Sequence, residues 1–185
     1  SYVYGKDDQH SSQLTCKAVS RLLYDIPINN YYTIFMDTIA DAVDIVGGVK
    51  VTLSEDLTEV SKDWYKGKTV SLNGQNALRF LQYRKESNQP RIARQQQFIK
   101  GFVASAKSAI FKDVSLPIKM YNRFSKTSVT NIKATSAVYL ATESLKANFK
   151  LHSVPGKTGF DGNYETFEVD EEALYEKVLE IFYND

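Results

Sequence analysis

The stretch SLNGQNALRFLQYRKESNQPRIARQQQFIKG, residues 71–101, combines two helix starts with a dense group of positive charges. Asn73 can cap a helix that begins near Gly74. Pro90 marks a second helix start, because proline is favoured at the first helical position. The whole chain has a net charge of only +1. Within this stretch, however, a single acidic residue, Glu86, accompanies six basic residues: Arg79, Arg84, Lys85, Arg91, Arg94 and Lys100.

The second predicted helix, residues 90 to about 109, carries two arginines in its first turn and an apolar face further along. Arg91 and Arg94 are three residues apart, so they are neighbours on one face. Positive side chains oppose the positive end of the helix dipole unless an anion binds there. This conflict indicates an anion site. The ordinary alternative is a solvated face or pairing with distant carboxylates, and spacing alone favours that alternative slightly.

Composition limits the class of protein. With 185 residues, of which 43% are hydrophobic, the chain can bury one sizeable core, so a single domain is expected. The near-neutral charge argues against a general nucleic-acid binder. Cys16 is the only cysteine, which excludes an internal disulfide and a thiolate metal cluster. His10 and His152 lack nearby carboxylates in a metal-ligand spacing. No apolar run approaches the roughly 20 residues that span a bilayer.

The order of apolar patterns predicts an α/β fold. A β-rich run within residues 26–36, a helix at 37–46 and an alternating strand at 49–53 suggest a β–α–β unit with a possible parallel pairing. We therefore predict a single layered domain with a central mixed β-sheet and helices on both faces. Further strands are predicted at 149–154 and 163–169, and further helices at 115–126, 131–147 and from 170 to the end of the chain.

Four motifs occur in a fixed order along the chain: GGVKV at 47–51, WYKGKTVSLNGQNAL at 64–78, YR at 83–84 and RIARQ at 91–95. Each is common by itself, but the ordered set resembles the LytR-CpsA-Psr family, the cell-wall glycopolymer ligases of Gram-positive bacteria. The resemblance runs from YVYG near the start to the helix after FEVD. It corresponds to the later two-thirds of the family domain, so we expect one domain, residues 1–185, without its N-terminal part.

The resemblance implies a function. Such proteins transfer an anionic glycopolymer, a teichoic acid or capsular polysaccharide carried on polyprenyl pyrophosphate, to a sugar hydroxyl of peptidoglycan. They act on the outer face of the membrane, which implies an N-terminal anchor in the parent protein. The family's arginines hold the pyrophosphate, and Arg84, Arg91 and Arg94 match them as catalytic residues, with Gln95 as a further pyrophosphate ligand. Guanidinium groups suit this task because they are permanently charged and bidentate.

This sequence departs from the family pattern in three ways. Gln82 stands where the first arginine of an R-x-R pair is expected, and Asn88 replaces an aspartate, so both are weaker pyrophosphate-binding candidates. The earlier part of the family domain, with its magnesium-binding aspartates and another arginine, is not in this chain. Mg²⁺ is thus expected for the complete domain, and this chain alone offers no recognisable metal ligand and could be inactive. Either an excised piece or a divergent relative fits.

Two other functions remain open. The first is a non-catalytic module that binds polyprenyl phosphates or anionic glycans with the same arginines. The second, suggested by the family's older label, is a transcription regulator. The chain has no helix-turn-helix signature and its basic residues concentrate in one stretch, so we expect no nucleic-acid partner.

A bound polyprenyl tail would need an apolar cavity. We expect the helices at 37–46 and 95–109 to leave an elongated hydrophobic pocket beside the arginines. The alternative is an ordinary solid core.

Overall fold

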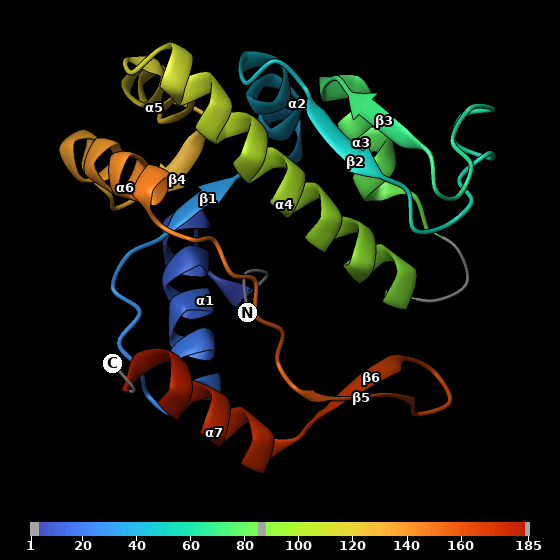
Figure 1. Ribbon diagram of the computed structural model, residues 1–185. Helices are drawn as coiled ribbons and strands as arrows, with labels where there is room; N and C mark the ends of the chain where they lie inside the picture. Colours follow the sequence, from blue (N-terminus) through green and yellow to red (C-terminus); the bar gives the residue numbers. More distant parts are fainter. Residues whose placement is uncertain (1–3, 85–87, 184–185) are drawn as a thin grey trace. The chain divides into compact units, whose positions relative to one another are not determined.

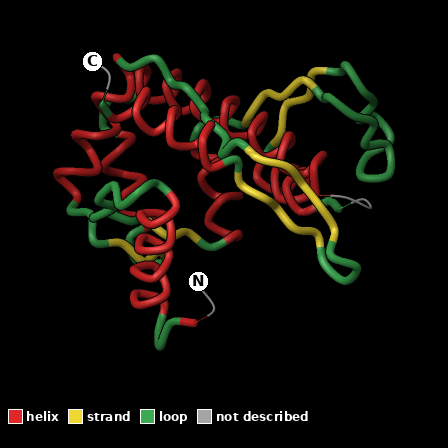
Figure 2. Tube along the Cα trace, turned by 90° about the horizontal axis from the view of Figure 1, so that it is seen from below, coloured by secondary structure: helices red, strands yellow, loops and turns green. Residues whose placement is uncertain are grey.

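The computed structural model describes residues 4–84 and 88–183, with only the backbone at 88 and 89. Helices make up most of the described chain and the strands are short (Figure 2). The helices are α1 (Asp8–Leu22), α2 (Met36–Ile45), α3 (Gly74–Gln82), α4 (Asn88–Lys112), α5 (Leu116–Phe124), α6 (Ala134–Lys146) and α7 (Glu171–Phe182) (Figure 1). Within these described ranges, no helix is long and apolar enough to cross a bilayer.

The strands form separate pairs. They are β1 (Tyr32–Ile34), β2 (Val49–Thr52), β3 (Thr69–Leu72), β4 (Ser128–Thr130), β5 (Gly156–Phe160) and β6 (Glu165–Val169). The pairs are β1–β4, β2–β3 and β5–β6. The mixed α/β composition is confirmed, but the predicted central sheet flanked by helices is wrong for the described part of the chain. The predicted β–α–β unit fails because β2 pairs antiparallel with β3, which follows it in sequence.

The chain divides into two compact units, which we describe separately. One contains residues 1–32, 129–131 and 152–185, and the other contains residues 33–128 and 132–151. The arginine-rich stretch lies in the second unit. The expectation of one domain over residues 1–185 remains a prediction.

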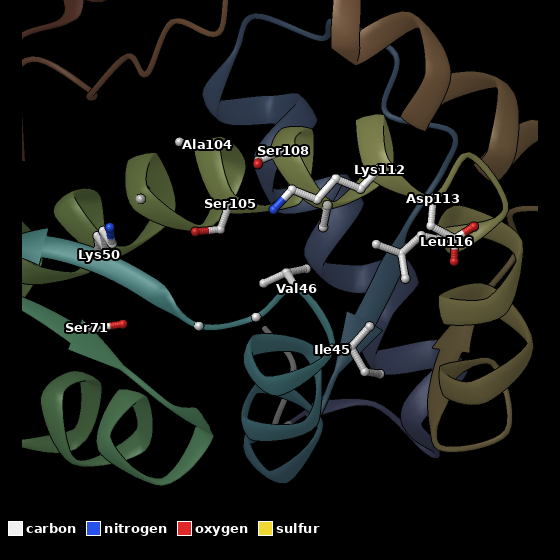
Figure 3. A pocket seen from close by; sticks show the side chains of 14 residues that line it. Ile45, Val46, Lys50, Ser71, Ala104, Ser105, Ser108, Lys112, Asp113 and Leu116 are labelled. Carbon is white, nitrogen blue, oxygen red and sulfur yellow. The ribbon is translucent and has the colours of Figure 1, made fainter.

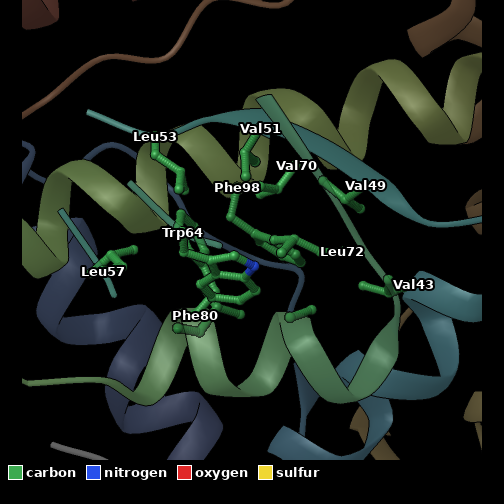
Figure 4. Packing of buried hydrophobic residues seen from close by; sticks show 12 residues of the cluster. Val43, Val49, Val51, Leu53, Leu57, Trp64, Val70, Leu72, Phe80 and Phe98 are labelled. Atoms are coloured by element: carbon green, nitrogen blue, oxygen red, sulfur yellow. The ribbon is translucent and has the colours of Figure 1, made fainter. Parts of the chain in front are cut away.

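The core of the second unit forms around the β2–β3 ribbon (Figure 4). Alternate residues of both strands are buried, as a ribbon with one covered face requires. The long β2–β3 connection contributes Trp64, whose ring meets that of Phe80 of α3 edge-on at a centroid distance of 6.0 Å. The buried cluster comprises Val43, Val49, Val51, Leu53, Leu57, Trp64, Val70, Leu72, Ala77, Phe80, Leu81 and Phe98.

The NGQNAL motif sets the start of α3 and its contact with α2. Asn73 Oδ1 accepts a hydrogen bond from the Asn76 N–H at 2.9 Å, which confirms the predicted cap. The Gly74 N–H donates to Asp44 Oδ1 at 2.8 Å. A Cβ at Gly74 would lie 2.4 Å from the Ala40 carbonyl oxygen. Only glycine therefore lets α3 approach α2 this closely.

The long helix α4 begins two residues before Pro90 and extends three residues past the predicted end. It crosses β2 at Gly101, where a Cβ would lie 2.6 Å from the Lys50 carbonyl oxygen and 2.9 Å from Val49 Cγ1. Gly101 therefore allows the helix backbone to touch the ribbon directly.

The first unit contains α1, α7 and the β5–β6 ribbon. Tyr24 Oη donates to the Glu171 carbonyl at 2.7 Å and to its carboxylate at 2.8 Å. The Tyr24 and Tyr175 rings pack edge to face at 5.2 Å. These contacts join the end of α1 to the start of α7.

Two element boundaries differ from the predictions. The strand predicted at 149–154 is wrong, because β5 occupies the glycine-containing segment after it. Helix α6 begins at Ala134, later than expected. Asn131, the polar residue at the start of the predicted helix and its expected cap, does not cap it: its side chain accepts from the Tyr31 N–H at 3.0 Å and donates to the Asn29 carbonyl at 2.7 Å.

The packing at Gly101 gives a stability prediction. Gly101→Ala should lower the free energy of unfolding by about 1–3 kcal/mol, because the added methyl group overpacks the contact with β2. An alanine in an open helix position would instead stabilise by up to about 1 kcal/mol. Urea unfolding measures the difference, with Ser108→Ala, at an exposed position of the same helix, as the control. A Gly101→Ala variant more stable than the parent protein would contradict this packing.

Candidate functional site: an arginine cluster beside an apolar cavity

Arg94 is a buried hub between α3, α4 and the segment after β2. Only 1% of it is exposed. Its Nε donates to the Phe80 carbonyl at 3.2 Å, and one terminal nitrogen donates to the Tyr83 carbonyl. The other terminal nitrogen binds Glu55 Oε1 at 2.5 Å. All three guanidinium nitrogens are therefore engaged by protein groups.

Tyr83 supports this hub with its side chain as well as its backbone. Its ring centre lies 5.5 Å from the guanidinium carbon of Arg94, a cation–π distance. The hydroxyl donates to the Glu59 carboxylate, and this hydrogen bond, together with partial burial, raises the pKa of Tyr83 above its ordinary value.

Arg91 differs from Arg94. It lies one helical turn earlier on α4 and is half-buried. Its Nε is buried and has no hydrogen-bond partner among the residues that the structure describes. A buried, unpaired guanidinium N–H is unfavourable, so this group is suited to an anionic ligand.

Arg84 is exposed and follows Tyr83, whose carbonyl is bound by Arg94. Arg94 therefore ties the segment that carries Arg84 to the helix that carries Arg91. Gln82 is the last residue of α3 and is exposed. The side chain of Asn88, like residues 85–87, lies outside the described part of the chain. The assignment of Arg84, Arg91, Arg94, Gln95, Gln82 and Asn88 as pyrophosphate ligands remains a prediction.

An apolar cavity of about 390 Å³ lies between α2 and α4. Gln95, the residue after Arg94, lines it, so the cavity begins beside the arginine motif. A hydrophobic pocket between these two helices is confirmed, while its predicted opening beside the arginine side chains remains a prediction. Its lining comprises Ile34, Met36, Ile39, Ala42, Leu81, Gln95, Phe98, Ile99 and Phe102.

A larger hollow of about 680 Å³ lies along the later part of α4 and contains none of the candidate arginines. Figure 3 shows Lys50 and Ser71 on the two strands of the ribbon, with Ser105, Ser108 and Lys112 on α4. Its mixed polar lining does not suit an isoprenoid tail. Size alone therefore does not identify the candidate site.

The described residues do not fit a magnesium site. No group of three or more His, Cys, Asp or Glu side chains in this part of the chain could hold a metal ion. Glu55 is paired with Arg94, and Glu59 accepts the Tyr83 hydroxyl. Sequence reasoning did not identify Glu55, because it lies 39 residues before Arg94 in a polar connection without a motif.

The profile of the LytR_cpsA_psr family matches residues 2–180, and the chain belongs to this family. The resemblance seen in the sequence motifs is thus confirmed. The match extends across both compact units.

Among curated proteins, the chain is similar to three Bacillus enzymes named polyisoprenyl-teichoic acid–peptidoglycan teichoic acid transferases. It is 26% identical to TagU of Bacillus subtilis over 98% of this chain and 58% of that protein. It is 28% identical to TagV of Bacillus subtilis over 74% of this chain and 35% of that protein. It is 32% identical to TagU of Bacillus cereus over 58% of this chain and 34% of that protein. The chain therefore spans only part of these relatives.

Solved structures show the same fold. Bacillus subtilis TagV has a TM-score of 0.71 at 23% identity, with 96% of this chain and 70% of that chain covered. TagT bound to LI-WTA has a TM-score of 0.72 at 22% identity, with 97% and 67% covered. The Lin1025 protein of Listeria innocua has a TM-score of 0.64 at 28% identity, with 89% and 73% covered.

The Arg94 hub gives a second prediction. Arg94→Ala should lower the free energy of unfolding by about 3 kcal/mol, because it leaves two carbonyls and Glu55 without their shared donor. Arg79→Ala, at an exposed position of α3, should change it by less than about 0.5 kcal/mol. Chemical denaturation of both variants measures the difference. Equal stabilities would show that the buried guanidinium does not hold these segments together.

Proposed function

We propose that this chain is the larger part of a transferase that moves an anionic glycopolymer from polyprenyl pyrophosphate to peptidoglycan. The observation that carries the proposal is the position of the apolar cavity directly beside the arginine motif on α4. Arg91 and Gln95 are four residues apart and share a helix face. Such a site suits an amphiphile with an anionic head and a long apolar tail. The names of the TagU and TagV relatives support the same substrate class.

In this proposal, Arg84 and Arg91 bind the pyrophosphate and Gln95 lies where head meets tail. A sugar hydroxyl of the acceptor attacks the phosphorus that carries the glycopolymer. The new phosphorus–oxygen bond joins the glycopolymer phosphate to peptidoglycan, the bond to the second phosphate breaks, and polyprenyl phosphate leaves. The hydroxyl proton passes to solvent or to a base. Guanidinium groups favour this step by balancing the negative charge that develops on the phosphate oxygens.

The contacts of Arg94 support a positioning role. Its guanidinium is occupied by protein partners, so it holds the segment of Arg84 against the helix of Arg91. A direct contact of Arg94 with phosphate, expected from the family motif, would require these bonds to rearrange.

Mg²⁺ remains an expectation for the complete family domain. Since the described residues do not fit a metal, no step of the proposal passes through one. We further propose that the parent protein acts on the extracellular face of the membrane and is anchored there outside this chain. The glycopolymer would be a teichoic acid or a capsular polysaccharide.

The second candidate is a binding module for polyprenyl phosphates or anionic glycans without chemistry of its own. The pairing of Glu55 with Arg94 and of Glu59 with Tyr83 favours it, because neither nearby carboxylate is free to accept a proton. A transferase would release polyprenyl phosphate when acceptor and metal are added, whereas a binding module would bind with no turnover. Among the residues that the structure describes, no feature favours a transcription regulator.

The head-group site is tested by titration with a polyprenyl pyrophosphate at fixed salt. Arg84→Ala and Arg91→Ala should each weaken binding roughly ten- to a hundredfold, since a hydrogen bond to a charged group contributes about 1.5–3 kcal/mol. Arg79→Ala and Lys100→Ala, which remove exposed charges outside the cluster, serve as controls and should change the affinity little. Equal losses in all four variants would indicate diffuse charge attraction and contradict a specific clamp.

The cavity is tested separately from the arginines. Ile99→Asn places a polar group in the cavity lining and should weaken polyprenyl pyrophosphate binding by roughly tenfold, while binding of inorganic pyrophosphate stays unchanged. Ile92→Asn, at a similarly exposed position of α4 outside the cavity, is the matched control. If both variants bind the lipid like the parent protein, the tail does not lie in this cavity.

A further inference from the structure

A second apolar cavity lies further along α4. It has a volume of about 450 Å³ and lies between α4 and the end of α6, within the same compact unit. From α4 it is lined by Phe102, Val103, Ala106, Lys107 and Ile110. Further lining comes from Ser144, Ala147 and the residues just after α6. Phe102 is the residue that lines both cavities.

The α4 residues of the two cavities form one continuous stripe. Gln95, Phe98, Ile99 and Phe102 line the first cavity, and Ala106 and Ile110 continue at the same spacing into the second. At 1.5 Å per residue, Gln95 and Ile110 are about 22 Å apart along the helix axis. The arginine motif lies at the start of this stripe. An anionic head group would therefore bind at that end, and an apolar tail would extend along the rest of the stripe.

The second cavity suits an apolar occupant. Of the two lysines in its lining, Lys107 donates to the Ala147 carbonyl at 2.6 Å, so this charge is engaged at the end of α6, and Lys150 is exposed at the surface. Ile110 is buried at one end of the cavity. At the other end, the ring of Phe102 stacks on that of Phe98 at 6.0 Å, with 27° between the ring planes. Phe102 therefore stands as a partition between two apolar compartments.

We propose that Phe102 is a specificity-determining residue that sets how far a polyprenyl tail extends along α4. This inference rests on the proposed function, since it takes the tail of that substrate as occupant. A short tail fills the first compartment alone. The distal isoprene units of a long tail reach the second compartment only when the Phe102 ring turns aside.

The test compares farnesyl pyrophosphate with undecaprenyl pyrophosphate, which share a head group, on the full chain. The readout is the ratio of the two affinities, measured by titration in one detergent. Phe102→Ala should raise the preference for the long tail by roughly tenfold, because it removes the partition. Phe102→Leu, which keeps most of the apolar volume in case the alanine variant fails to fold, should give a smaller shift in the same direction.

Ala106→Phe is the matched variant, because it fills the second compartment and leaves the first intact. It should reduce undecaprenyl pyrophosphate binding several-fold and leave farnesyl pyrophosphate binding unchanged. If the parent protein binds both lipids and no variant changes the ratio, the role of Phe102 is overturned while the proposed function stands. If the parent protein binds neither lipid, the proposed function fails as well.

Discussion

The candidate site depends on a buried positive charge that the protein neutralises from three directions. A guanidinium out of water is strongly unfavourable unless its donors and its charge are matched. Arg94 obtains two carbonyl acceptors from the end of α3 and a carboxylate from Glu55 after β2. These bonds fix three chain segments that are distant in sequence. Through the Tyr83 carbonyl, Arg94 also joins the segment of the exposed Arg84 to the helix that carries the half-buried Arg91.

Different parts and faces of the helix α4 make different contacts. Its start carries the arginines, one face lines the two apolar cavities, and Gly101 brings another face against the backbone of β2. A helix in direct backbone contact with a ribbon has little freedom to roll about its axis. The direction of the apolar stripe relative to the arginines is therefore set by a residue that lines neither apolar cavity.

Local features of the site were predictable, and long-range ones were not. The cap at Asn73 followed from residue spacing, because it depends on neighbouring positions, whereas the apolar pocket between α2 and α4 was expected only from the lipid tail that the family resemblance implies. The central sheet did not form among the described residues. Alternating apolar residues predict a strand but do not predict which strand pairs with it. In this structure β2 pairs with β3. The burial of Arg94 could not be predicted for the same reason, because its carboxylate partner, Glu55, is far from it in sequence.

The close contact between α2 and α3 has a consequence for the adaptability of the cavity. The Gly74 N–H to Asp44 bond and the absence of a side chain at Gly74 join these helices without intervening atoms. Ile39 and Ala42 on α2 and Leu81 on α3 thus form one stiff wall. Any adjustment of the cavity would therefore have to come from the opposite wall on α4, where Ile99 is exposed and Phe102 is half-buried. Under the proposed function, a tail of irregular shape would be accommodated by side-chain rearrangement on α4, while the two shorter helices keep their spacing.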